Sequence, residues 1–239
     1  MRTKTLLMAL AALAAGVLSS NAQPVYSANI VGYVNIPVTS GFNTIANPLN
    51  NSIGNSLTNI IPPGPAFDGS VVSLWNGTTY VSYVIDSTFP TGVADPGDNF
   101  AVTPPVLNPG QAFFVNNTVG SNTVTLVGSV AIGGPGPGSV GLATNTLTSS
   151  PVQSFSASII PVGGGIESTN FNLPLQVGDQ VLFWTGGGYS VNLYGGPGQW
   201  YNGVTFNPIS TPNLTVGQGF YYQNNQGANE QWNQNVIVQ

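Results

Sequence analysis

The chain has 239 residues and a net charge of −5, and only 4% of its residues are charged. Cys and His are absent, and Arg2 and Lys4 are the only basic residues. This composition excludes nucleic acids and anionic membrane surfaces as partners, because Lys and Arg neutralise phosphate in such complexes.

The same absences argue against an enzyme. A Ser nucleophile has no His or Lys base beside it, phosphoryl transfer has no cationic clamp, and zinc lacks its usual His and Cys ligands. Glycoside hydrolysis stays open, because it requires only two suitably spaced carboxylic acids, and the chain has seven acidic residues. We therefore expect a non-enzymatic protein without a cofactor.

Residues 1–22 have the features of a secretory signal peptide. Two basic residues precede the apolar stretch 6–18, and small residues precede a cleavage site at Gln23. A retained signal anchor is the alternative, but a membrane span needs about 20 apolar residues. We expect the mature chain to be secreted and not inserted in a membrane.

Three blocks in the first half of the chain recur in the same order in the second half. The matched blocks are 41–49 with 154–162, 72–80 with 181–189, and 107–114 with 214–221. We interpret them as two copies of a unit of about 100 residues, a common domain size. A Gly/Pro-rich run between them cannot hold a helix or a central strand. The predicted organisation is a signal peptide at 1–22, a first repeat at 23–131, a linker at 132–139 and a second repeat at 140–239.

Alternation of polar and apolar residues, as in 123–126 and 189–193, predicts short β-strands. Asn76-Gly77 predicts a type I′ hairpin turn, because both central residues of that turn need a positive φ. A longer turn is predicted at 185–188, and a short helix at 55–61. Many short strands between turns predict an all-β fold of two tandem antiparallel β-sandwich units, jelly-roll or Ig-like.

Large aromatic residues stand at matching places in the two copies. We expect them in the core, because large aromatic side chains dominate the cores of such folds. The predicted core residues are Phe42, Trp75, Phe113, Phe155, Trp184 and Phe220. Gln111 and Gln218 each follow a Gly at a predicted turn, and we expect their amides to cap that turn.

The first copy also carries the motifs of a known kind of module. The succession Phe-x-x-Ile-Ala-Asn-Pro-Leu (42–49), Leu-Trp-Asn-Gly-x-x-Tyr (74–80) and Leu-x-Pro-Gly-Gln-x-Phe-Phe (107–114) resembles a repeated β-sandwich module of exported, mostly uncharacterised surface proteins of Gram-negative bacteria. The second copy lacks the Asn-Pro-Leu and the Pro of Pro-Gly-Gln. The resemblance implies a β fold and export to the outer surface of a Gram-negative bacterium, and it transfers no catalytic residue.

One segment has ligands suited to calcium. Asp95 and Asp98 flank a Pro-Gly turn and offer hard oxygen atoms. The segment lacks the spacing of an EF-hand loop, and an ordinary Asp/Pro/Gly turn is the alternative. Calcium is the one metal that stays open.

The first functional hypothesis is a structural or adhesive protein that assembles with itself through strand edges. Residues 25–38 and 235–238 could each add a strand to a neighbouring molecule. Natural sheets guard their edges with Lys and other charged residues, and the chain has no Lys after Lys4.

The second hypothesis is binding of a neutral polysaccharide by exposed aromatic residues. Aromatic rings can stack on sugar rings while Asn and Gln bond hydroxyl groups. The alternative is that these aromatic residues fill cores. The candidate ligand-binding residues are Tyr83, Tyr194, Trp200, Tyr201, Tyr222 and Trp232.

Overall fold

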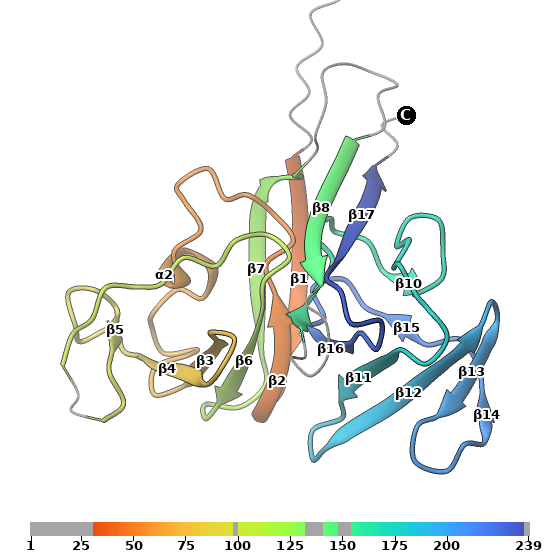
Figure 1. The fold of residues 1–239 in the computed structure, drawn as a ribbon. Coiled ribbons are helices and arrows are strands. Elements are labelled where there is room, and N and C mark those ends of the chain that lie inside the picture. Colours follow the sequence, from red (N-terminus) through yellow and green to blue (C-terminus); the bar gives the residue numbers. More distant parts are fainter. Residues whose placement is uncertain (1–30, 98–99, 132–140, 148–153, 237–239) are drawn as a thin grey trace, which may run out of the picture.

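The computed structural model describes residues 31–97, 100–131, 141–147 and 154–236 (Figure 1). The predicted signal peptide at 1–22 and the predicted linker at 132–139 lie outside these residues. Within them, no helix is long and apolar enough to cross a membrane.

The first half of the chain forms a five-stranded sheet and a two-stranded ribbon. The sheet has the strand order β2-β6-β3-β4-β5, and the ribbon pairs β1 with β7. Inward-facing residues of β1, such as Val34 and Ile36, pack against Val72, Phe113 and Val115 of the sheet, so the core lies between ribbon and sheet. The elements are β1 (Val31–Val38), β2 (Gly41–Ala46), α2 (Leu57–Ile60), β3 (Val71–Trp75), β4 (Tyr80–Ile85), β5 (Val93–Ala94), β6 (Ala112–Asn117) and β7 (Asn122–Ser129).

The second half forms a six-stranded sheet, a ribbon of β8 with β17, and a short pair of β10 with β15. The sheet order is β14-β13-β12-β11-β16-β9. Trp232 of β17 and Leu147 of β8 pack against Val181 and Phe220 of the sheet. The strands are β8 (Gly141–Leu147), β9 (Ser154–Ser156), β10 (Gly164–Gly165), β11 (Gln180–Trp184), β12 (Tyr189–Gly196), β13 (Gln199–Asn202), β14 (Pro208–Ile209), β15 (Asn213–Leu214), β16 (Phe220–Gln223) and β17 (Glu230–Val236).

Every paired strand in the described part of the chain is antiparallel, and the only helix there, α2, falls within the predicted short helix at 55–61. The all-β prediction is therefore confirmed. The named strands pair only with strands of their own half, so the described residues exchange no strand between the halves.

Two turn predictions are wrong in detail. Trp75 pairs with Tyr80 and Trp184 with Tyr189, so each hairpin has a four-residue loop and the second is not longer. Gly77 has a φ of +97°, whereas Asn76 is not among the residues of positive φ. Asn76 Oδ1 instead accepts the backbone N–H groups of Thr78 and Thr79, which stabilises a different turn from type I′.

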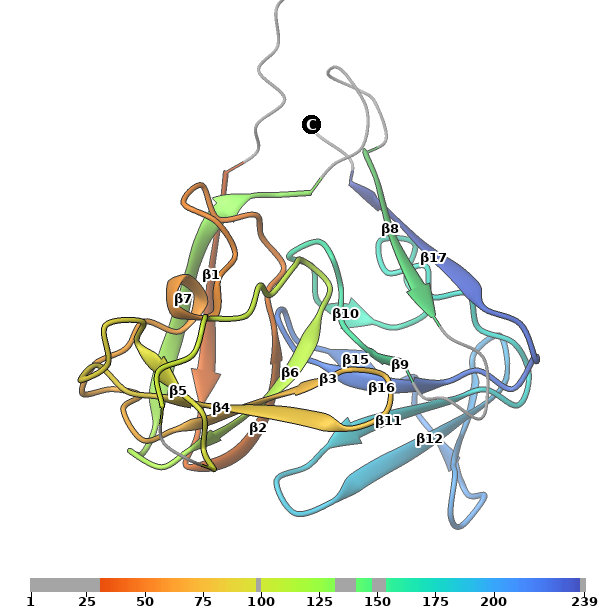
Figure 2. The same cartoon turned by 60° about the vertical axis from the view of Figure 1, so that its left-hand side comes forward.

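The two halves lie side by side and meet through the outer faces of their sheets (Figure 2). The backbone N–H of Ala46 donates to the carbonyl of Gly217 at 2.8 Å. In the reverse direction, the N–H of Ala157 donates to the carbonyl of Gly110 at 3.1 Å. The contact is thus the same on both sides, as in a two-fold interface.

The predicted core residues divide into three groups. Phe113, Phe155 and Phe220 are buried, and Trp75 and Trp184 are half-buried against the contact between the halves. The core prediction is wrong for Phe42, which is 49% exposed. Phe42 lies at the start of β2 on the outer face of the sheet, where the other half covers it only in part.

Candidate functional site

Most of the predicted ligand-binding aromatic residues are core residues of the second half. Trp200, Trp232, Tyr222 and Tyr194 are buried, so the prediction that they offer exposed faces is wrong. The six-stranded sheet and its covering ribbon bury them because they stand on the inward-facing positions of β12, β13, β16 and β17.

Their polar atoms are satisfied inside that core. The indole N–H of Trp200 donates to Glu167 Oε2 at 2.8 Å, and that of Trp232 donates to the carbonyl of Phe171 at 2.6 Å. Such partners are what allow Trp to be buried at little cost. The two remaining candidates, Tyr83 and Tyr201, are half-buried and lie in different halves of the chain.

Glu167 is an ionised group held within the second half. Burial raises its pKa, but hydrogen bonds from Gly198 N, Trp200 Nε1 and Thr211 Oγ1 outweigh this effect, so its pKa lies below the usual value. Its carboxylate thus holds together three donors from different segments of the second half.

Two further acidic residues, Asp179 and Glu230, meet at the hydroxyl of Tyr222. That hydroxyl donates to Asp179 Oδ2 and lies 3.2 Å from Glu230 Oε2. Burial raises the pKa of Glu230, and the negative charge of Asp179 raises it further. Burial and the two acidic groups also raise the pKa of Tyr222. These contacts join Tyr222 of β16 to Glu230 of β17 and to Asp179, which directly precedes β11.

A group of partly exposed aromatic residues gathers elsewhere, where the outer faces of the two sheets meet. The hairpin β3–β4 presents Trp75 and its cross-strand partner Tyr80, with ring centroids 5.0 Å apart. The hairpin β11–β12 presents Trp184 and Tyr189 in the same way, 5.1 Å apart. Tyr80 and Tyr189 are 40% and 41% exposed.

Stacked rings form the floor between these hairpins. Phe155 stacks on Phe114 at 5.0 Å and on Tyr221 at 4.5 Å. Phe114 also contacts Tyr80 and Trp184 edge to face, so the rings form one continuous cluster across the two halves. Burial raises the pKa of Tyr221 to about 12, so its hydroxyl stays neutral.

A cleft of about 310 Å³ opens onto this cluster. We call it the aromatic cleft, and its lining residues are Phe42, Ser73, Tyr80, Phe114, Trp184 and Tyr189. Trp184 is fixed across it by its indole N–H, which donates to the carbonyl of Phe42 at 2.8 Å. The lining has no charged side chain, so the cleft suits an uncharged ligand with apolar faces.

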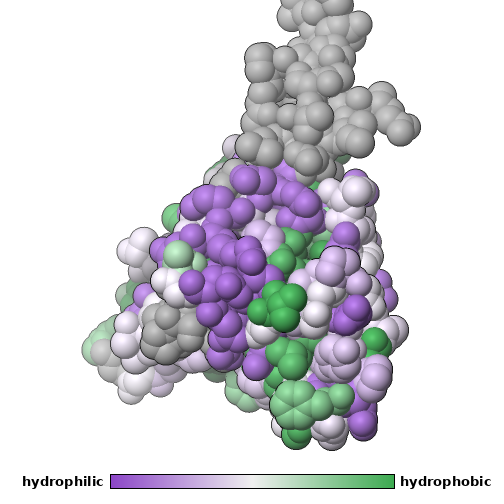
Figure 3. Space-filling view, turned by 45° about the vertical axis from the view of Figure 1, so that its right-hand side comes forward, coloured by the Kyte–Doolittle hydropathy of each residue, from purple (hydrophilic) through white to green (hydrophobic). Residues whose placement is uncertain are grey.

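The face of the molecule in Figure 3 is largely polar but carries few charged groups. Figure 3 shows hydrophilic side chains gathered over part of this face, with a band of hydrophobic ones next to them. Since only 4% of the chain is charged, the hydrophilic groups are mainly amides and hydroxyls.

The calcium prediction stays a prediction. Asp95 Oδ1 accepts the backbone N–H of Gly97 at 2.7 Å, while Asp98 lies outside the described residues. Among the residues described, no three Asp, Glu, His or Cys side chains stand close enough together to hold a metal ion.

Sequence reasoning missed Tyr80, Tyr189, Phe114 and Tyr221 as parts of the aromatic cluster between the halves. A signal was available, because a Tyr follows the hairpin Trp by five positions in both copies. Residues so placed around a four-residue loop are cross-strand neighbours on one face. What the sequence could not show is that the outer faces of two sheets would meet there.

No protein-family model, no curated protein and no solved structure matches the chain. The function must therefore be argued from the chemistry of the cleft and of the surface around it.

Proposed function

We propose that the protein is an exported, non-enzymatic adhesive protein that binds a neutral polysaccharide through the aromatic cleft. The observation that carries the proposal is a cleft lined by five aromatic residues and one Ser, without a charged group. The apolar faces of sugar rings can lie against such rings, and the hydroxyl groups around them need neutral donors and acceptors. The signal-like residues 1–22 support the proposed export, and the lack of basic residues and Cys after Lys4 supports the proposed absence of catalysis. The resemblance to exported surface proteins supports a place on the outer surface of a Gram-negative bacterium.

We also propose that the two halves are tandem β-sandwich copies of one unit. The hairpins of β3–β4 and β11–β12 have loops of equal length and the same Trp–Tyr pair. Each half has a ribbon across the inner face of its larger sheet. The outer faces then form a shared surface, which gives the aromatic cleft one wall from each copy.

Retention on insoluble polysaccharides tests the proposed function. The mature chain is mixed with cellulose, chitin and insoluble starch, and the bound fraction is measured by depletion. We expect retention on at least one of them, and a loss of about tenfold or more in affinity for Tyr80→Ala/Tyr189→Ala, since a central aromatic contact typically contributes over 1 kcal/mol.

The control is Tyr33→Ala, because Tyr33 is 65% exposed on the outer face of β1, away from the cleft. It should bind like the wild type. Wild-type protein that stays in solution with all three polymers, or a double variant that is retained equally well, would overturn the proposal.

Self-assembly is the second candidate, favoured by the β1–β7 ribbon. The ribbon has only these two strands, so each presents an edge that no other named strand pairs with in the described part of the chain. Tyr33 stands opposite Val127 on its outer face, and both side chains are exposed. No Lys guards these edges.

Sedimentation velocity at increasing protein concentration tests this candidate. We expect oligomers in the wild type and monomers in Tyr33→Lys/Val127→Lys, because charged side chains on edge strands disfavour pairing with a strand of another molecule. A wild type that stays monomeric at every concentration would exclude assembly through this ribbon.

A further inference from the structure

Two further grooves flank the contact between the halves, and they are built alike. Groove 1 has a volume of about 490 Å³ and groove 2 about 330 Å³. Each has the Trp and the Gly-Gln turn of one half on one side, and the first strand of the other half's sheet on the other side. Groove 1 uses Trp184 and the turn at Gln218 against β2, and groove 2 uses Trp75 and the turn at Gln111 against β9.

The strand register shows that the correspondence is a structural one. An isolated bridge joins Ile45 of β2 to Gln218, and the matching bridge joins Ser156 of β9 to Gln111. Together with the reciprocal N–H to carbonyl bonds described above, these bridges place each Gln at the same point of its groove. The two grooves are therefore related by the two-fold arrangement of the halves.

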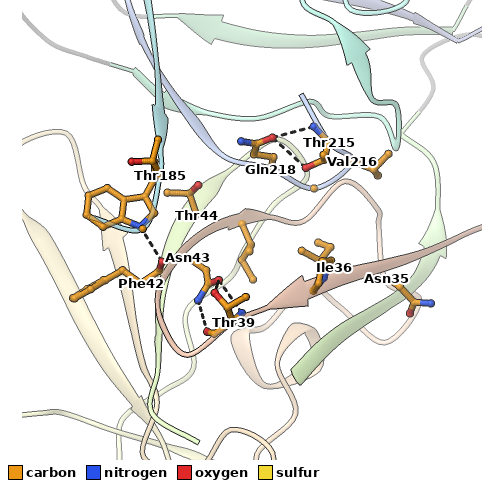
Figure 4. A pocket seen from close by; sticks show the side chains of 15 residues that line it. Asn35, Ile36, Thr39, Phe42, Asn43, Thr44, Thr185, Thr215, Val216 and Gln218 are labelled. Atoms are coloured by element: carbon orange, nitrogen blue, oxygen red, sulfur yellow. Dashed lines mark hydrogen bonds between the residues drawn. The ribbon is translucent and has the colours of Figure 1, made fainter. Parts of the chain in front are cut away.

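Both Gln side chains use one end of the amide to hold their turn. Gln218 Oε1 accepts the backbone N–H of Thr215 at 3.0 Å and its hydroxyl at 3.1 Å (Figure 4). Gln111 Oε1 accepts the backbone N–H of Asn108 at 3.3 Å. The predicted capping role of these two residues is thus confirmed.

The other end of each amide is available to a ligand. Neither Gln218 Nε2 nor Gln111 Nε2 donates a hydrogen bond to any residue in the described ranges. Figure 4 shows the Gln218 amide nitrogen directed away from Thr215, toward the side of Thr44 and Thr185. Because Oε1 is fixed by the turn, the orientation of the NH₂ group is fixed as well.

The grooves share a ligand chemistry. Each combines a half-buried indole with an oriented amide donor and further amide or hydroxyl groups, and neither has a charged lining residue. We infer that grooves 1 and 2 are two equivalent binding sites for neutral sugar residues, so that one chain engages two segments of polysaccharide. This inference rests on the proposed function. Two sites on one chain raise the avidity for a polymer without any new kind of contact.

The four Trp residues provide the readout. In a ¹H–¹⁵N spectrum, the indole signal of Trp75 reports on groove 2, and that of Trp184 reports on groove 1 and on the aromatic cleft, which Trp184 also lines. Trp200 and Trp232 are buried and serve as internal references. The titrant is cellohexaose, chitohexaose or maltohexaose, chosen as the oligomer of whichever polysaccharide retains the wild type. We expect the Trp75 and Trp184 signals to move and the Trp200 and Trp232 signals to stay.

The matched variants are Gln111→Glu and Gln218→Glu. A carboxylate still accepts the backbone N–H that holds the turn but has no N–H to donate, so the fold is kept and the donor is lost. Gln111→Glu should raise the concentration that half-saturates the Trp75 shift about tenfold and leave the Trp184 shift unchanged, and Gln218→Glu should do the reverse. Gln199→Glu makes the same change at an exposed position outside all three cavities and should alter neither.

The outcomes separate the inference from the proposed function. The inference is wrong, and the proposed function stands, if the wild type is retained but only one of the two indole signals responds. The same holds if neither Gln variant raises the half-saturating concentration measured at the Trp of its own groove. If no polysaccharide retains the wild type, the proposed function is wrong, and the assignment of sugar residues to grooves 1 and 2 is wrong with it. Unchanged Trp200 and Trp232 signals in each variant show that it is folded.

Discussion

The indole N–H of Trp200 donates to the carboxylate of Glu167 at 2.8 Å inside the second half. This hydrogen bond ties β13 to the turn that follows β10. Hydrogen bonds to charged groups are about twice as strong as neutral ones, and this bond joins a fully buried ring to an ionised acceptor.

Trp200→Phe should therefore destabilise the protein strongly. The change removes a charged hydrogen bond and part of a buried side chain, and we expect a loss of about 2–4 kcal/mol in the free energy of unfolding. Trp184→Phe removes a solvent-exposed hydrogen bond to a neutral carbonyl from a half-buried ring and should cost about 1 kcal/mol or less. Urea unfolding followed by circular dichroism compares the two, and equal losses would contradict the assignment.

Glu167→Gln tests the sign of one pH effect. The pKa of Glu167 is lowered in the folded state, so its ionised form contributes stability above the unfolded pKa, and this contribution is lost as the pH falls through the folded pKa. The variant should be less stable than the wild type at pH 7, and the difference should shrink at a pH below the ordinary Glu range. A constant difference at every pH would mean that charge is not the cause.

Glu230→Gln tests the opposite sign. Burial and Asp179 raise the pKa of Glu230, so the folded state prefers the protonated carboxyl and loses stability as the pH rises from the unfolded pKa through the folded one. The variant keeps an acceptor for Tyr222 and removes the charge. We expect it to be more stable than the wild type at pH 7, with a smaller advantage in acid. The measurement is the unfolding midpoint in urea over that pH range.

Gly217→Ala should cost more than a positive φ alone explains. Gly217 and Gly227 both have a φ of +73°, but a Cβ at Gly217 would lie 2.3 Å from Ile36 Cδ1, whereas one at Gly227 would meet nothing within 4 Å. We expect a loss of about 1 kcal/mol for Gly227→Ala and about 2–4 kcal/mol for Gly217→Ala. If urea unfolding gave the same loss of unfolding free energy for both variants, the contact between Gly217 and Ile36 would adjust to the added methyl group without cost.

Ionic strength should have little effect on stability. From Gln23 onward the chain has no Lys, Arg or His, so salt can screen no ion pair between its side chains. The melting temperature of the mature chain should change little between low salt and about 0.5 M NaCl. A large loss of stability in salt would contradict this, and adding calcium or a chelator would then test whether a bound ion is responsible.

The local structure was largely predictable from the sequence. The strand class, the Gln caps and the short helix before Pro62 follow from short-range patterns. Which face of each strand is buried was harder to predict from the sequence. Alternation gives a period of two residues but does not say which face the second half of the chain will cover, and this is why Phe42 was expected in the core.

The first pair of repeat blocks also needed the structure. The sequence blocks align Phe42 with Phe155. In the structure Thr44 pairs with Phe114 and Phe155 pairs with Tyr221, and Phe114 and Tyr221 are equivalent in the two copies. Thr44 is therefore the structural equivalent of Phe155. A shift of two residues keeps every side chain on the same face, so the hydrophobic pattern cannot detect it. Trp200 and Trp232 were misjudged for another reason, because their N–H partners come from distant parts of the chain.

The two ends of the described chain lie at one pole of the fold, because β1 and β17 belong to the two ribbons. The first described strand begins, and the last one ends, at the same pole of the fold in Figures 1 and 2, whereas the loop of the β11–β12 hairpin lies at the opposite pole. A tether attached ahead of β1 or beyond β17 would therefore leave the β11–β12 hairpin, with Trp184 and Tyr189, on the side away from it. A molecule held to a surface at that pole would present this hairpin, which supplies Trp184 and Tyr189 to the aromatic cleft, to its surroundings.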